Sequence, residues 1–392
     1  MDRRTFLGLG LGAAAAWPLD SWSAETQLTK RLRLRELGLI IGELEPGAYN
    51  AITDVAGVRV GHVTLVKGEG ALVVGKGPVR TGVTAILPHG GVLSKEAVYA
   101  ADFTLNGNGE LTGMGHVRGR GLLAAPVLFT NTSSIGNVYD GAMGWMLERD
   151  EGLLTRGDHI EPIVGETWGD FLNDTAGRHV KPEHARRAIE SAKSGPVAEG
   201  CVGGGTAMRA FRFKAGIGTA SRLVPCGEMV YTVGVLVQAN FGGRSQLLVD
   251  GIPVGREIPD LMPEQGQVGK DKSMLVAVAT DAPLLPVQLQ RLCKRVALGM
   301  ARTGAISTHG SGDLFLAFST GQKVVRGEEH RVQSLHNRWI SRMHQAVVES
   351  TEEAILNSLT MAHTMTGRDG NTYHALPLDR LQEIMRAHGR LK

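Results

Sequence analysis

The stretch of sequence that decides the fold is Ser273-Met274-Leu275-Val276-Ala277-Val278-Ala279-Thr280-Asp281-Ala282-Pro283. It is an unbroken apolar run rich in β-branched residues, it is too short for a typical helix, and Asp281 and Pro283 end it. Such a run predicts a buried strand. The preceding segment 264–272 is polar and contains glycine, which indicates a loop. Ser273 therefore lies where a loop meets a rigid strand.

A serine at this boundary gains a function if the chain is cut in front of it. Cleavage between Lys272 and Ser273 would leave Ser273 with a free amine beside its hydroxyl. An α-amine has a reference pKa of about 7.7–8.0, so a large fraction is unprotonated near neutral pH and can act as a base for the hydroxyl. The alternative is that Ser273 only begins a strand and has no chemistry.

Three separated motifs resemble those of a known family. Ser-x-x-x-x-x-Ala-Thr-Asp-Ala-Pro-Leu begins at Ser273, and residues 303–315 read Thr-Gly-Ala-Ile-Ser-Thr-His-Gly-Ser-Gly-Asp-Leu-Phe. The third, Asn-Ala-Ile-Thr-Asp-Val-x-Gly-Val-x-Val-Gly-His, begins at Asn50. They are similar to the P1 (DmpA-like) peptidase family, which contains the L-aminopeptidase/D-alanyl-esterase-amidase enzymes and the β-peptidyl aminopeptidases. The resemblance extends from about Leu37 to the C-terminus.

This resemblance implies an α/β fold, a four-layer α-β-β-α sandwich resembling N-terminal-nucleophile hydrolases. It implies one catalytic domain, residues 25–392, that cleaves itself into chains 25–272 and 273–392. The implied activity is that of a serine aminopeptidase or amidase, which releases N-terminal residues from peptides, amides or esters with a free amine through an acyl-enzyme on Ser273. No cofactor and no metal is expected. The resemblance also implies a homo-oligomer, namely a tetramer of processed units.

The resemblance also gives Ser273 three partners. Ser311 and Asp313 are two positions apart, so in an extended segment they face the same side, and Gly312 between them permits close approach. Many relatives have Glu in place of Asp313. Asn240 matches an asparagine whose amide donates to the oxyanion. Without the family, Gly-Ser-Gly-Asp is a common turn, and asparagine is favoured where a strand enters a turn.

Glu166 matches a carboxylate that binds the substrate's ammonium group, and a desolvated cation requires an opposite charge. Two other residues depart from the family. Trp168 stands where relatives have Tyr, and its indole N–H can donate a hydrogen bond but cannot accept one. Trp168 therefore either keeps an oxyanion donor or only walls the pocket. Lys272 replaces the Gly or Asn that often precedes the nucleophile, which bears on the speed of self-cleavage.

Three alternatives remain open at this level. An acyltransferase similar to the ornithine acetyltransferases would share a related fold, but those enzymes cleave at threonine. A catalytically degenerate family member would account for Lys272 and Trp168. His309 lies close enough to Ser311 to suggest a Ser–His–Asp arrangement, although no GxSxG nucleophile elbow accompanies it.

Composition and the N-terminal sequence indicate the class of protein and its expected cellular location. The 392 residues are 42% hydrophobic and 21% charged, with a formal charge of +3. The charges are interspersed, so electrostatics gives no case for nucleic-acid binding. Arg3-Arg4-Thr5-Phe6-Leu7, followed by a short apolar region and small residues, predicts a twin-arginine export signal over residues 1–24. A disordered basic start is the alternative. We expect a periplasmic protein that is not bound to the membrane after export.

The remaining pattern predicts elements that alternate along the chain. Strands are expected at 126–132, 229–240 and 314–319, and helices at 138–149, 182–193, 285–302, 332–360 and 378–388. Residues 97–101 suggest another helix, and 247–254 a strand that completes a hairpin with 229–240. The Gly- and Asn-rich segment 106–113 cannot be regular and resembles a family signature near the active site. Gly203-Gly204-Gly205 indicates close backbone packing rather than a phosphate-binding loop.

Overall fold

The computed structural model describes residues 30–157, 159–263 and 272–391, and all elements below belong to the unit Arg31–Lys392. The predicted export signal, residues 1–24, lies outside the described residues. So does segment 264–271, most of the expected loop before Ser273. No helix of the described chain is long and apolar enough to cross a membrane.

The larger sheet contains the strand that begins at Ser273. Its six strands run in the order β4-β3-β12-β11-β10-β9. Their bounds are β3 Glu96–Gly107, β4 Leu122–Leu123, β9 Ile217–Cys226, β10 Met229–Asn240, β11 Lys272–Thr280 and β12 Ser311–Val325. β11 pairs antiparallel with β10 and parallel with β12. Every side chain from Met274 to Ala279 is completely buried, which confirms the predicted interior strand.

A second sheet of four strands lies over the first, in the order β1-β2-β5-β6. Its bounds are β1 Arg59–Lys67, β2 Val79–Leu87, β5 Val127–Asn131 and β6 Ile163–Thr167. Apolar residues from the two sheets, among them Leu275 of β11 and Ile163 of β6, form one buried cluster between them.

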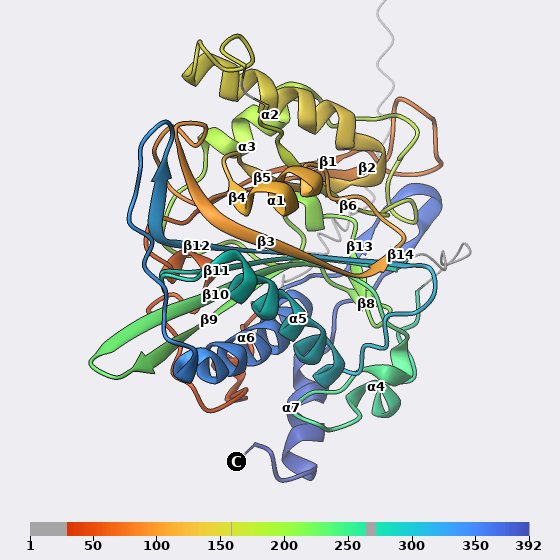
Figure 1. The fold of residues 1–392 in the computed structure, drawn as a ribbon. Coiled ribbons are helices and arrows are strands. Elements are labelled where there is room, and N and C mark those ends of the chain that lie inside the picture. Colours follow the sequence, from red (N-terminus) through yellow and green to blue (C-terminus); the bar gives the residue numbers. More distant parts are fainter. Residues whose placement is uncertain (1–29, 158, 264–271, 392) are drawn as a thin grey trace, which may run out of the picture. The chain divides into compact units, whose positions relative to one another are not determined.

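Helices cover the outer faces of both sheets (Figure 1). The pair α2 Ile135–Arg149 and α3 Pro182–Glu190 packs on the smaller sheet, and the pair α5 Pro286–Arg302 and α6 Ile340–Thr360 on the larger. The expected four-layer α-β-β-α sandwich is confirmed. The shorter elements are α1 Met114–Arg120, α4 Val254–Glu257, α7 Leu378–Ala387, β7 Arg209–Ala210, β8 Phe213–Lys214, β13 Met365–Thr366 and β14 Thr372–Tyr373.

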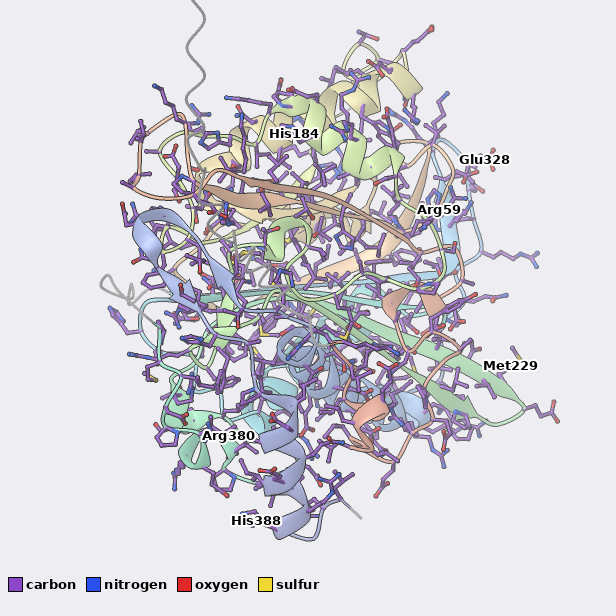
Figure 2. The ribbon with its side chains drawn as sticks, turned by 180° about the vertical axis from the view of Figure 1, so that it is seen from behind. Arg59, His184, Met229, Glu328, Arg380 and His388 are labelled. Carbon is purple, nitrogen blue, oxygen red and sulfur yellow. The ribbon has the colours of Figure 1, made fainter. Side chains whose placement is uncertain are left out.

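The hairpin of β9 and β10 extends beyond the body of the larger sheet (Figure 2). Met229 and Val230 at its tip are each 56% exposed, although both are apolar. The other end of β10 is completely buried and leads to Asn240. The same strand therefore has an exposed tip and a buried end.

The glycines at 203–205 pack closely, as predicted. They form a short 3-10 helix, and a Cβ on Gly204 would lie 2.5 Å from the Phe129 carbonyl oxygen. Gln238 next to them joins the two sheets: its Nε2 donates to the Thr130 carbonyl at 2.8 Å and to the Thr167 hydroxyl at 2.7 Å.

Two predicted elements are wrong. Residues 97–101 belong to strand β3 instead of a helix, because pairing with β4 and β12 overrides the helix preference of alanine. Residues 247–254 do not complete a hairpin with β10, because β9 and β11 already occupy both edges of that strand. They form a tight turn in which Val249 and Ile252 exchange backbone hydrogen bonds. The predicted helix 332–360 begins only at Ile340.

Candidate active site

Ser273 lies where three strand ends meet. Its Cα is paired with Asn240 at the end of β10 and with Gly312 at the start of β12. Side chains alternate along β11, and Leu275 belongs to the cluster between the sheets, whereas Met274 belongs to the cluster under the helices. Ser273 is in phase with Leu275 and therefore faces the space between the sheets. It is 4% exposed.

Asn240 is the neighbour of Ser273 on this face. Directly paired residues of antiparallel strands have Cβ atoms about 4.5–5.5 Å apart. The amide of Asn240 is fixed at both ends: Nδ2 donates to the Trp168 carbonyl at 2.8 Å, and Oδ1 accepts from the Arg209 backbone N–H at 3.3 Å. These bonds use one of its two N–H groups, which leaves the second to donate to a further acceptor.

Ser311 and Asp313 lie together, as expected, but on the opposite face of the sheet end. The Ser311 hydroxyl donates to Asp313 Oδ1 at 2.8 Å. The carboxylate also accepts from the backbone N–H of Met274, the residue after Ser273. Asp313 therefore lies near the backbone that follows Ser273, on the face opposite to the Ser273 side chain. Burial raises the pKa of Asp313, and these hydrogen bonds oppose that rise.

A second serine, which the sequence analysis did not identify, also holds Asp313. The Ser307 hydroxyl donates to Oδ2, the other carboxylate oxygen. Ser307 has a backbone φ of +46°, in the left-handed region that residues with a Cβ rarely adopt. A serine six positions before the carboxylate carries no periodic signal, so only the loop conformation shows the contact.

Glu166 comes from β6 of the smaller sheet and is buried. Its carboxylate accepts hydrogen bonds from the Glu110 backbone N–H at 3.2 Å and from the Thr132 hydroxyl. Burial raises the pKa of Glu166, and these two bonds lower it by less. A carboxylate held by neutral donors in a buried place retains a strong attraction for a cation.

The segment 106–113 joins Glu166 to the strand ends. A Cβ on Gly109 would lie 3.2 Å from Glu166 Oε1 and 3.3 Å from Gly312 Cα, so the backbone of Gly109 fills the gap between them. Asn108 N–H donates to the Ser311 carbonyl at 3.2 Å. The signature segment therefore lies at the site, as predicted.

The two residues that depart from the family lie at the edges of this arrangement. Trp168 directly follows β6 and its backbone carbonyl accepts the Asn240 hydrogen bond, while the residue is 36% exposed. Its described contribution to the site comes from the backbone. Lys272 is the first residue of β11 and is paired with Ser311.

The arrangement disfavours a Ser–His–Asp site. His309 is exposed, and both oxygens of Asp313 accept hydrogen bonds from serines, which argues against a Ser–His–Asp arrangement. Within residues 30–157, 159–263 and 272–391, no group of three His, Cys, Asp or Glu side chains could hold a metal ion.

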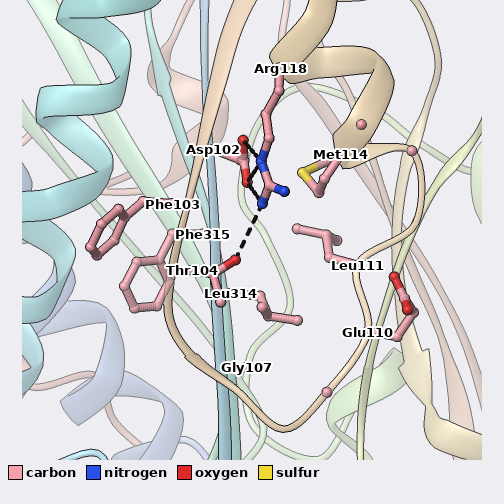
Figure 3. A pocket seen from close by; sticks show the side chains of 13 residues that line it. Asp102, Phe103, Thr104, Gly107, Glu110, Leu111, Met114, Arg118, Leu314 and Phe315 are labelled. Carbon is pink, nitrogen blue, oxygen red and sulfur yellow. Dashed lines mark hydrogen bonds and ion pairs between the residues drawn. The ribbon is translucent and has the colours of Figure 1, made fainter.

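A pocket of about 330 Å³ adjoins the site (Figure 3). Gly109 and Glu110, which contact or hold Glu166, also line this pocket, so the two share a wall. Leu111, Met114 and Leu314 contribute apolar side chains to a lining that is mostly polar. At its far side Arg118 forms an ion pair with the buried Asp102 (Figure 3).

The sequence model of peptidase family S58 matches residues 50–373. The chain is 48% identical over 374 residues to the β-peptidyl aminopeptidase BapA of Sphingosinicella microcystinivorans. The aligned region covers 92% of this chain and 93% of that protein. The solved β-aminopeptidase of Burkholderia sp. is 41% identical with a TM-score of 0.82, and covers 91% of this chain and 99% of its own.

A further solved structure is the L-aminopeptidase D-Ala-esterase/amidase of Ochrobactrum anthropi. It has a TM-score of 0.85 and 39% identity, and covers 92% of this chain and 99% of its own. That protein is described as a prototype for the serine aminopeptidases and as a variant of the Ntn hydrolase fold. The similarity to this chain extends over nearly all the described residues.

Proposed function

Because the chain belongs to peptidase family S58 and is an aminopeptidase, we propose that it hydrolyses the bond after an N-terminal residue through an acyl-enzyme on Ser273. The observation that carries this proposal is the position of Ser273. Its hydroxyl faces the space between the sheets, beside Asn240 and at the border of the segment that would be cut. The acyltransferase alternative is disfavoured, because those enzymes cleave at threonine.

The first step of the proposal is self-cleavage between Lys272 and Ser273. The Ser273 hydroxyl attacks the Lys272 carbonyl carbon, the C–N bond breaks, and the nitrogen takes up a proton as the new α-amine. Water then hydrolyses the resulting ester and releases Ser273 as a chain terminus. Ser311 and Asp313 lie by the backbone at this point, so they can hold the new amine by hydrogen bonds.

In turnover, the free amine takes the proton of the Ser273 hydroxyl as it attacks the substrate carbonyl. The second N–H of Asn240 donates to the oxyanion, and Glu166 binds the ammonium group of the substrate. The amine then gives its proton to the leaving group, and water releases the acyl residue. This assignment makes a free N-terminus a requirement for binding.

For the substrate class, we propose residues with a β-amino group, because the relative that is 48% identical is a β-peptidyl aminopeptidase. L-α-amino acid and D-alanyl substrates are the competitors, as in the Ochrobactrum anthropi enzyme. A panel of β-alanyl, L-alanyl and D-alanyl p-nitroanilides compares the three by kcat/KM. Preference for an α-amino substrate would contradict this part of the proposal.

We further propose that residues 1–24 direct twin-arginine export and that the mature enzyme acts in the periplasm, because the paired arginines precede a short apolar region. A tetramer of processed units is proposed as well. The exposed apolar tip of the β9–β10 hairpin, with Met229 and Val230, supports association with another copy. Cell fractionation and light scattering test the two proposals.

The decisive test compares the wild type with Ser273→Ala. We expect denaturing mass spectrometry to show two chains split between Lys272 and Ser273 in the wild type, and one intact chain that does not hydrolyse aminoacyl p-nitroanilides in the variant. Ser245→Ala, at an exposed serine, is the matched control and should behave as the wild type. An intact wild-type chain with full activity would contradict the mechanism, and efficient acyl transfer to an amino acid would favour the transferase.

A further inference from the structure

A lysine with no exposed surface lies behind Asn240. Lys214, in β8, donates from Nζ to the Met208 carbonyl at 2.8 Å and to the Ala215 carbonyl at 2.7 Å. The thiol of the buried Cys201 lies near enough for the two groups to shift each other's pKa. Burying an ammonium group is costly unless it is compensated, so a lysine in this position calls for an explanation.

Cys201 is able to supply the compensating charge. Burial by itself would raise the pKa of this thiol, but the Lys214 ammonium and His363 together lower the pKa to about 7. Near neutral pH a substantial fraction of Cys201 is therefore a thiolate that faces an ammonium. Burial lowers the pKa of Lys214, and the neighbouring Cys201 opposes that change.

The charge is connected to the candidate oxyanion donor through a single peptide unit. The Met208 carbonyl that accepts from Lys214 belongs to the same peptide as the Arg209 N–H. That N–H donates to Asn240 Oδ1 at 3.3 Å, and Asn240 Nδ2 donates to the Trp168 carbonyl at 2.8 Å. Two hydrogen bonds, joined by the Met208–Arg209 peptide, thus connect the Lys214 amino group to the side-chain amide beside Ser273.

Hydrogen bonds in such a chain polarise one another. A cation on the Met208 carbonyl withdraws electrons from the peptide and makes the Arg209 N–H a stronger donor. A stronger bond to Asn240 Oδ1 in turn makes the Asn240 N–H groups more positive and holds the amide in one orientation. Both effects stabilise an oxyanion, whose negative charge develops only as the reaction proceeds.

We propose that Lys214 is a positioning residue for the oxyanion, which orients and polarises the Asn240 amide through the Met208–Arg209 peptide. This inference rests on the proposed function, because it requires Asn240 to contact the oxyanion. A purely structural role predicts a different result. If the role is structural, Lys214→Met lowers the Tm, because it leaves the buried Met208 and Ala215 carbonyls without this donor, and it lowers activity by the same factor with or without Asn240.

The test is a double-mutant cycle with Lys214→Met and Asn240→Ala, measured on protein shown by mass spectrometry to be processed. We expect Lys214→Met to lower kcat about tenfold with little change in KM, measured at a temperature well below the Tm of the variant, since it weakens one donor without removing it. Asn240→Ala should lower kcat by about 10²–10³. In the Asn240→Ala background, Lys214→Met should have no further effect, because the residue through which it acts is gone.

The outcomes separate the two proposals. If Lys214→Met lowers kcat by the same factor in the wild-type and the Asn240→Ala backgrounds, the role of Lys214 is overturned and that of Asn240 stands. The same holds if the activity of Lys214→Met is lost only at temperatures where the variant unfolds. An Asn240→Ala enzyme with wild-type kcat would overturn the oxyanion assignment itself. Lys193→Met, at an exposed lysine, is the matched control and should change nothing.

Two measurements keep the test decisive when a variant folds or processes poorly. Lys214→Gln retains a donor to the Met208 carbonyl and lacks the charge, so it enters the same cycle if Lys214→Met is insoluble. If Asn240→Ala is not processed, the rate of self-cleavage of the Lys214 variants is compared with that of the wild type instead of kcat, because attack on the Lys272 carbonyl also develops an oxyanion beside Ser273. Unchanged self-cleavage in both Lys214 variants would contradict the proposal.

Discussion

Glu166 and Asp313 show how burial and neutral donors prepare the two carboxylates of the site. Burial raises the pKa of both groups, and in each case hydroxyl and backbone donors oppose the rise. Neither has a cation among the contacts that hold it in the described structure. Each carboxylate therefore retains its attraction for an amine, which the proposed mechanism uses for the substrate's amine at Glu166 and for that of Ser273 at Asp313.

Glu166→Gln tests this reasoning for the substrate amine. Because a hydrogen bond to a charged group contributes about 1.5–3 kcal/mol, we expect kcat/KM to fall about 10- to 100-fold, mainly through KM. A protonated Glu166 cannot bind an ammonium group, and its raised pKa places that loss above the usual pH range of a carboxyl group. Wild-type kcat/KM should therefore fall as the pH drops into that range, and the variant should lose this dependence. Equal KM values for both proteins would contradict the assignment.

At the scale of elements, the site depends on backbone that passes very close to β12. A Cβ on Gly312 would lie 2.4 Å from the Asn108 carbonyl oxygen and 2.9 Å from Gly109 Cα. Gly109 in turn lies against Glu166. The segment 106–113 therefore packs between β12 of the larger sheet and β6 of the smaller one, and a shift of this segment would move Glu166 relative to Ser273. The glycines are needed because neither backbone has room to move away.

Gly312→Ala is therefore expected to displace this segment and to misplace Glu166 relative to Ser273. A shift of about 1 Å at a reacting centre can cost about 10²-fold in rate, so we expect a loss of kcat/KM of that order and slower self-cleavage. Rates from p-nitroanilide hydrolysis and mass spectrometry provide the measurement. Gly136→Ala in α2 is the control, since its Cβ meets nothing within 4 Å. If Gly312→Ala retains full activity, the close contact does not matter.

At the scale of the whole molecule, a buried ionic network joins α6 to the larger sheet. Arg222 of β9 has no exposed surface, and it contacts Glu349 at 3.0 Å and Glu353 at 2.7 Å. Arg35 near the start of the described chain also contacts Glu353, at 2.9 Å. The network fixes one outer helix against the sheet that carries Ser273.

Glu353→Ala removes one partner and leaves Arg222 buried with incomplete compensation. We expect unfolding free energy to decrease by about 3–5 kcal/mol. Denaturant unfolding measures this, and activity at low temperature should persist because the site is built elsewhere. Glu148→Ala breaks an ion pair with Arg186 at the surface, where solvent screens both charges, and should change the unfolding free energy far less. Equal losses for the two variants would show that burial of the network is unimportant.

Periodicity and motifs predicted much of this molecule. The apolar run after Ser273, the amphipathic helix 285–302 and the layered fold were all predicted, because each depends on a local pattern of side chains. The helix expected at 97–101 failed because strand pairing outweighs the preference of alanine for a helix. The expected hairpin at 247–254 failed because the availability of a strand edge is not written in the segment itself.

The sequence by itself determined the family, the order of the main strands and helices, and the residues at the strand ends: Ser273, Asn240, Ser311 and Asp313. Only the tertiary structure decided that Ser273 and Asn240 face the space between the sheets while Asp313 lies on the other side. It also decided that Ser307 donates to the Asp313 carboxylate. The position of Lys214 behind Asn240 is a third feature that depends on it. Local patterns report whether a residue is buried or in a strand. Which groups meet depends on strand register and on loop conformations that join residues far apart in the chain.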